Sequence, residues 1–107
     1  MFFTERCRGL SVRLTDGTVH RLFGSAGSSL VASDFFCEGQ SGMHGVALDP
    51  AFASNRRVYV YFASNLNAAP RSNRVARLTL NAAFTAASDR VDIVTDIAFK
   101  HVGNAVG

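Results

Sequence analysis

Residues 39–62 read GQSGMHGVALDPAFASNRRVYVYF, a glycine-rich polar loop that runs directly into apolar strand sequence. Three glycines surround a single amide side chain, Gln40. Residues 45–48 form a short apolar run that an Asp-Pro pair stops, because proline cannot donate to a strand ladder. Residues 58–62 are apolar on both faces, which is typical of a central strand in a sheet covered on both sides. The stretch therefore predicts two strands, joined by a turn with one helical turn at 51–57.

The sequence on either side has strand periodicity. Residues 1–6 open the chain as a strand, and residues 10–23 alternate apolar and polar side chains around an Asp-Gly pair, which predicts a hairpin with a two-residue turn. Residues 24–34 are small and polar and predict a loop. Residues 74–80 alternate as in a more exposed strand, and residues 91–97 form a further short strand. Strands at about ten-residue spacing without a convincing helix predict an all-β chain.

The arrangement of these strands favours β-propeller blades. Strands buried on both faces that alternate with half-exposed ones are typical of stacked four-stranded blades. At roughly 40–50 residues per blade, the 107 residues make about two blades. Two blades cannot close a ring, so either the chain is a piece of a larger protein or its architecture is different.

The composition excludes several functional classes. With 48% hydrophobic and 18% charged residues the chain is globular rather than disordered. Its net charge of +3 comes from scattered arginines rather than from a basic stripe, which argues against nucleic-acid binding. No apolar run approaches the roughly 20 residues of a membrane helix, and the first residues lack a signal-peptide core.

The remaining polar residues of the sequence match no known catalytic or metal-binding motif. The sequence contains no P-loop, dinucleotide fingerprint, zinc spacing or EF-hand loop. Asp89, Asp92 and Asp96 are spaced along a strand and its turn, and we interpret them as solvated edge charges. His44 precedes a strand and is predicted to be structural, and His20 is expected at the surface.

Cys7 and Cys37 are the only cysteines, and their spacing does not suggest a metal site. In an oxidising compartment they could form one disulfide that closes a loop of about thirty residues, worth roughly 3–4 kcal/mol in the chain-entropy model. In a reducing compartment they would be two small buried side chains.

The motifs resemble those of a known family. Residues 39–62 are similar to the pattern Gly-Gln-x-Gly-x-x-Gly-Val-Ala-x-x-Pro-x-Phe, followed by Asn and an aromatic strand, of the glucose/sorbosone dehydrogenases. Members are quinoprotein sugar dehydrogenases with a six-bladed propeller that use pyrroloquinoline quinone (PQQ) and calcium. Residues 1–13 resemble the family's opening strand pair, and residues 73–81 resemble its next outer strand. The resemblance implies that residues 1–107 are the N-terminal blades of one such propeller domain.

The resemblance assigns a role to Gln40. In the family the glutamine of this motif lies beside the cofactor and the sugar at the top of the ring. An amide offers a donor and an acceptor to a sugar hydroxyl or a quinone oxygen, and glycines allow close approach of the backbone. The alternative is that Gln40 only ties down the backbone of its own loop.

The implied activity is oxidation of a sugar carbon. A histidine removes the hydroxyl proton while hydride passes to the quinone, and calcium holds and polarises the cofactor. The base and most cofactor and calcium ligands are expected beyond residue 107, so the chain is expected to hold no catalytic residue and to be inactive alone. His101 lies in a glycine-containing loop without the sequence context of the base and is interpreted as a loop residue.

The resemblance also implies partners and a location. A sugar, an electron acceptor and the remaining propeller blades are expected partners, with self-association in their absence. A periplasmic or secreted location is implied, and it favours the Cys7–Cys37 bridge. The alternative function is a non-catalytic extracellular propeller that acts as a binding module.

Overall fold

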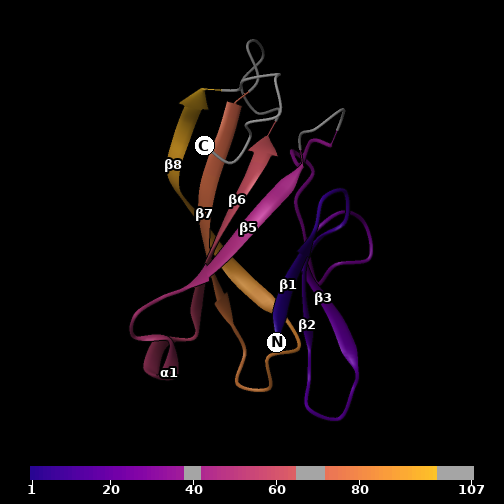
Figure 1. The fold of residues 1–107 in the computed structure, drawn as a ribbon. Coiled ribbons are helices and arrows are strands. Elements are labelled where there is room, and N and C mark those ends of the chain that lie inside the picture. Colours follow the sequence, from indigo (N-terminus) through magenta and orange to yellow (C-terminus); the bar gives the residue numbers. More distant parts are fainter. Residues whose placement is uncertain (38–41, 65–71, 99–107) are drawn as a thin grey trace.

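The computed structural model describes residues 1–37, 42–64 and 72–98, which form two four-stranded sheets (Figure 1). The first sheet has the order β1 (Phe2–Glu5), β2 (Gly9–Arg13), β3 (Val19–Gly24) and β4 (Leu30–Val31). The second has the order β5 (Met43–Leu48), β6 (Arg57–Ser64), β7 (Ser72–Leu80) and β8 (Ala87–Ala98), and a single helical turn, α1 (Phe52–Asn55), joins β5 to β6. The prediction of all-β blades is confirmed.

One apolar core lies between the two sheets. The rings of Phe23 in β3 and Phe62 in β6 meet edge to face, with centroids 5.4 Å apart, and so connect the sheets at the middle of the core. Both rings are fully buried. Alternating side chains of β6 and β7, together with apolar residues of β2 and β3, supply most of the rest of this core. Its members are Leu10, Val12, Leu22, Phe23, Ala32, Met43, Val58, Val60, Phe62, Ala76, Leu78, Leu80 and Ala87.

The aromatic strand β6 lies inside the second sheet, between β5 and β7. Val58, Val60 and Phe62 on its core face are fully buried. Tyr59 and Tyr61 on its other face are only half-buried in the part of the chain that the structure describes. The prediction of a central strand is therefore correct, whereas full cover of both faces is not observed.

The alternating strand β7 is also an interior strand, and the expectation of a more exposed strand is wrong. Ala76, Leu78 and Leu80 are at most 1% exposed and point into the core. The reason is β8, which pairs along the outer side of β7 and extends from residue 87 to 98, longer than the segment predicted at 91–97. Alternation along a strand records which face is buried, not whether the strand is an edge.

The hairpin between β2 and β3 is present, but its turn is longer than predicted. The backbone N–H of Leu14 donates to the carbonyl of Thr18 at 2.9 Å, so residues 15–17 form a three-residue turn. The Asp16 carboxylate accepts hydrogen bonds from the backbone N–H of Thr18 at 3.0 Å and from its hydroxyl at 2.7 Å. These side-chain bonds stabilise the longer turn.

The other end of this strand pair requires two glycines. Gly9 and Gly24 face each other across β2 and β3, with φ angles of 112° and 137°. A Cβ on either residue would lie 2.9 Å from the Cα of the other. The close approach brings the start of β2 against the end of β3 and leaves no room for side chains there.

Residues 24–34 were expected to form a loop, yet they contain β4. This two-residue strand pairs in parallel with Phe23 and Gly24 and is too short to produce a periodic pattern. Next to it, the Ser29 hydroxyl donates to the carbonyl of Leu22 at 2.9 Å and accepts from the N–H of Ala87 at 3.0 Å. Ser29 thus links the two sheets by hydrogen bonds.

The Asp-Pro turn after β5 is organised by one carboxylate. Asp49 accepts hydrogen bonds from the Tyr59 hydroxyl at 2.6 Å, the Ala51 N–H at 2.8 Å and the Asn55 amide at 3.1 Å. The hydrogen bond from Tyr59 is the main reason why the pKa of Asp49 falls to about 2. In return, the bond to Asp49 raises the pKa of Tyr59. Asp49 of the Asp-Pro pair is therefore part of a structural turn.

Three aromatic rings pack together next to α1. Phe52 of α1 stacks on Phe84, with ring centroids 5.7 Å apart, and meets Phe2 of β1 edge to face at 5.8 Å. Phe2 lies in the first sheet, whereas Phe52 and Phe84 lie in two connections of the second sheet, α1 and the turn between β7 and β8. The phenylalanine of the Pro-x-Phe motif therefore packs between the sheets.

Candidate functional site

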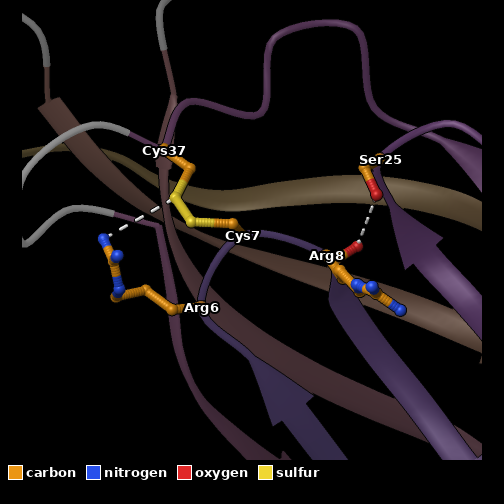
Figure 2. Close-up of a disulfide and its surroundings, with 5 residues drawn as sticks. All are labelled: Arg6, Cys7, Arg8, Ser25 and Cys37. Carbon is orange, nitrogen blue, oxygen red and sulfur yellow. Dashed lines mark hydrogen bonds between the residues drawn. A yellow bond between two sulfur atoms is a disulfide. The ribbon is translucent and has the colours of Figure 1, made fainter.

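The turn between β1 and β2 lies at the end of the sheets where β5 begins and β6 ends (Figure 1). Cys7 in this turn is joined to Cys37 by a disulfide, with the two Cα atoms 5.3 Å apart and thirty residues apart in sequence. Figure 2 shows that the guanidinium of Arg6 extends beside this bridge, and its Nη1 lies 3.7 Å from the Cys37 sulfur. The structure thus connects the start of the glycine-rich loop covalently to the first sheet.

The residues that follow segment 38–41 contact the same turn between β1 and β2. The N–H of Met43 donates to the carbonyl of Arg6 at 2.9 Å. Gly42 has a φ of 120°, and a Cβ there would lie 2.8 Å from the Cγ and 2.9 Å from the carbonyl carbon of Arg6. Only glycine fits this approach without displacing its neighbour. Arg6 therefore contacts residues on both sides of the segment 38–41.

Gln40, the predicted ligand-binding residue, lies in that segment and so outside the described residues. His101 lies outside them as well. His44 is in β5 and half-buried, and its Nε2 is buried without a hydrogen-bond partner in the part of the chain that the structure describes. His20 in β3 is half-buried rather than fully at the surface. Of the described histidines, neither lies in a recognisable catalytic arrangement.

A cluster of charged side chains lies between the sheets. Asp34, which follows β4 and is 4% exposed, accepts two hydrogen bonds from the Arg90 guanidinium at 2.6 and 2.8 Å. It also accepts one from the Ser64 hydroxyl at 2.6 Å. The Arg90 guanidinium lies over the rings of Phe23 and Phe62, 5.5 and 5.3 Å from their centroids. Arg90 of β8 therefore connects the two sheets through its ion pair with Asp34 and its cation–π contact with Phe23, and it also covers Phe62 of its own sheet.

The electrostatics of this cluster follow from its contacts. Burial alone would raise the pKa of Asp34, but the hydrogen bonds from Arg90 and Ser64 outweigh burial and lower the pKa to about 2. The bond to Asp34 raises the pKa of Arg90. Both groups are therefore charged at neutral pH. The pair is separated by 56 residues, and no sequence signal indicated it.

Asp92 belongs to the same cluster, and its interpretation as a solvated edge charge is wrong. Its carboxylate pairs with Arg90 and with the buried Arg74 on the neighbouring strand β7. Burial would raise the pKa of Asp92, but hydrogen bonds from both arginines lower it. Asp89 is exposed, as predicted. Asp92 is paired rather than solvated because the pairing of β8 with β7 brings it next to Arg74.

The described residues do not form a metal centre. In residues 1–37, 42–64 and 72–98, no three His, Cys, Asp or Glu side chains converge as calcium or zinc ligands would. Nor is any helix within these ranges long and apolar enough to cross a membrane.

The face of the second sheet that points away from the first carries a shallow apolar groove of about 300 Å³. Its lining includes Val46, Tyr59, Tyr61 and Val75. In the described residues these tyrosines have no sheet packed on them, in contrast to the core face. The groove is therefore a surface on which a further layer could pack.

Three solved structures with a similar fold are named as dehydrogenases of sugars. Two named glucose dehydrogenase match with TM-scores of 0.69 and identities of 24% and 25%, over 86% of this chain and 27% and 25% of theirs. The soluble aldose sugar dehydrogenase of Escherichia coli, in its apo form, matches with a TM-score of 0.53 and 22% identity over 81% of this chain and 26% of its own. No curated protein matches the chain.

The two four-stranded sheets, of which the first includes one parallel pair, pack face to face and define β-propeller blades like those of these solved structures. The family model named Glucose / Sorbosone dehydrogenase matches residues 1–107. The chain therefore belongs to the glucose/sorbosone dehydrogenase family. It spans about a quarter of the length of the solved glucose dehydrogenases that it matches.

Proposed function

We propose that this chain is the N-terminal part of a PQQ- and calcium-dependent dehydrogenase that oxidises a sugar carbon of an aldose or of sorbosone by hydride transfer. Family membership over residues 1–107 supports the sugar dehydrogenase part of this proposal. The structural observation that supports it is the position of the described residues on either side of Gly39 and Gln40. Cys37 is joined to Cys7 in the β1–β2 turn, and Gly42 lies against Arg6 of the same turn and accepts a hydrogen bond from the N–H of Ala63 near the end of β6. Ligand sites are commonly found where loops gather at one end of a β scaffold.

Within this function, Gln40 is proposed to bind the sugar or the cofactor. Its amide can donate to one oxygen and accept from a hydroxyl, so it can fix the orientation of a sugar without adding charge. PQQ, when bound, supplies the two-electron acceptor of the reaction. The described residues do not form a calcium site, and the calcium ligands are proposed to lie outside this chain. The catalytic base is proposed to lie outside this chain, which leaves the chain inactive alone.

The remaining blades are the proposed partner of the apolar groove on the second sheet. Tyr59 and Tyr61 are half-buried there, whereas the core face of the same strand is fully covered by the first sheet. A further blade would remove these rings from water in the same way. A periplasmic or secreted location is proposed because the Cys7–Cys37 disulfide persists in oxidising compartments.

A dye-linked assay of sugar oxidation with added PQQ and calcium tests the function. The full-length protein is expected to oxidise aldoses, and residues 1–107 alone are expected to show no turnover. Gln40→Ala should raise KM or weaken PQQ binding by about tenfold, the loss of one good hydrogen bond to a ligand. Ser88→Ala, a change at an exposed position in β8 outside this loop, is the control and should have little effect.

The outcomes separate the alternatives. A full-length protein that neither binds PQQ nor oxidises sugars would contradict the proposal and favour the non-catalytic binding module. Turnover by residues 1–107 alone would show that the base lies within the chain and would point to His101.

A further inference from the structure

The two sulfurs of the disulfide between Cys7 and Cys37 have different surroundings. Cys7 lies in the β1–β2 turn and is exposed, whereas Cys37 is half-buried. The guanidinium of Arg6 lies on the Cys37 side of the bridge, with its Nη1 3.7 Å from the Cys37 sulfur (Figure 2). The two ends of the bridge therefore differ both in exposure and in the charge beside them.

These differences matter for thiol–disulfide exchange, in which one sulfur is attacked and the other leaves. The incoming thiolate must reach the attacked sulfur, and the leaving sulfur must accept a negative charge. A neighbouring arginine stabilises a thiolate. Exposure therefore favours attack at Cys7, and the cation of Arg6 favours departure of Cys37. Both differences favour the same direction of cleavage.

The residues before Cys37 are held in place by contacts other than the disulfide. The N–H of Phe36 donates to the carbonyl of Ala63 in β6 at 2.9 Å. The ring of Phe35 meets the fully buried ring of Phe62, with centroids 6.2 Å apart. Opening the bridge would therefore leave these residues attached to the second sheet.

The turn that carries Cys7 is also held independently of the bridge. The N–H of Arg8 donates to the carbonyl of Glu5 at 3.1 Å. The N–H and the hydroxyl of Ser25 donate to the carbonyl of Arg8 at 3.0 and 3.1 Å (Figure 2). Because other contacts hold both segments, the two sulfurs stay close after cleavage, and their high effective concentration favours reclosure.

We propose that Cys7 is a reversible thiol-modification site, at which a small external thiolate attacks the Cys7 sulfur and Cys37 leaves as a thiolate stabilised by Arg6. The S–S bond of the protein breaks, its electron pair goes to the Cys37 sulfur, and a new S–S bond joins Cys7 to the incoming group. Attack of the Cys37 thiolate on Cys7 expels the small thiol and restores the bridge. The assignment does not depend on sugar oxidation.

The first test identifies the sulfur that is attacked. The native full-length protein is treated with 2-mercaptoethanol, which carries no charged group that arginines would attract, and quenched at early times with excess N-ethylmaleimide. Mass spectrometry of the peptides that contain Cys7 and Cys37 then locates both labels. We expect the 2-mercaptoethanol adduct on Cys7 and the maleimide on Cys37. Removal of the thiol from unquenched protein should restore the bridge without denaturant.

The second test measures the contribution of Arg6 to the rate of adduct formation. Arg6→Gln should slow the reaction about threefold, because one charge in a largely solvated site stabilises a thiolate only modestly, and high salt should reduce the difference. Arg6→Lys keeps the cation and should restore most of the rate. Arg13→Gln removes an exposed arginine at the opposite end of β2 and is the matched control, with an unchanged rate.

Three results would overturn the proposal. They are an adduct mainly on Cys37, an unchanged rate in Arg6→Gln, and no adduct at any thiol concentration that leaves the protein folded. Circular dichroism establishes that each variant is folded before rates are compared. If Arg6→Gln does not fold, the position of the adduct in the wild-type protein still decides the question.

Discussion

The ion pair between Asp34 and Arg90 allows a quantitative prediction. Asp34→Asn keeps the size of the side chain and removes its charge. Arg90 retains Asp92 as a counterion, at 2.8 Å, so the variant does not leave a buried charge unpaired. The expected loss is therefore the attraction between Asp34 and Arg90 and not the larger cost of an isolated buried cation.

The size of this loss follows from the pKa of Asp34. The gap between its ordinary pKa of 3.8 and its folded value of about 2 corresponds to about 2 kcal/mol of stability at neutral pH. Because the folded pKa is the lower one, this contribution is fully present above about pH 4. It decreases as the pH falls and is lost as the pH passes through about 2, where the folded carboxylate takes up its proton.

Urea unfolding at pH 7, 4 and 2.5 measures the difference between wild type and Asp34→Asn. We expect about 2 kcal/mol at pH 7 and a clearly smaller difference at pH 2.5. Asp89→Asn is the matched control, because Asp89 is exposed and next to Arg90, and it should change stability by no more than about 0.5 kcal/mol. A loss for Asp34→Asn that is the same at all three pH values would refute the electrostatic reasoning.

Three further predictions concern the covalent frame, a close backbone approach and a titrating tyrosine. Thiol titration of denatured, unreduced protein should find no free thiol, and two free thiols would contradict the disulfide. Replacing both cysteines by serine should lower the free energy of unfolding by about 3.6 kcal/mol, the chain-entropy value for a thirty-residue loop. Gly24→Ala should lower the free energy of unfolding by about 3 kcal/mol or more, whereas Gly45→Ala should change it little; equal effects in urea titrations would contradict the steric argument. Asp49→Asn should lower the pH at which Tyr59 ionises, observed by ultraviolet absorbance with Tyr59→Phe to assign the signal, and an unchanged titration would show that their hydrogen bond is absent.

Strand periodicity predicted which segments form strands, but not which strands lie inside a sheet. The hairpin, the aromatic strand β6 and the one-turn helix α1 follow from local patterns, because turn residues and side-chain alternation act over a few positions. The interior position of β7 does not, since alternation along one strand says nothing about what pairs on its outer side. The short strand β4 has only two residues and therefore no pattern to find.

The polar residues show the same limit. The sequence pattern around Asp92 predicts a solvated charge. In the structure, the pairing of β8 with β7 places Asp92 against Arg74. The register of this pairing is a tertiary property that the local sequence does not show. Asp34 and Arg90 are 56 residues apart and meet only because the two sheets pack face to face. For Gln40 the sequence supplies the motif, and its role stays a prediction.

By itself, the sequence determined the all-β class, the family and the residues available for a disulfide, because these depend on composition, short-range periodicity and a continuous motif. The tertiary structure decided which charges are buried, which strand faces are covered and that Cys37 and Met43, on either side of residues 38–41, both bind the β1–β2 turn. The physical reason is that burial and pairing arise between segments distant in sequence, where no local propensity records them. Arg6 illustrates the difference: in the sequence it is one scattered arginine, and in the structure its backbone and side chain contact both flanks of the proposed ligand-binding loop.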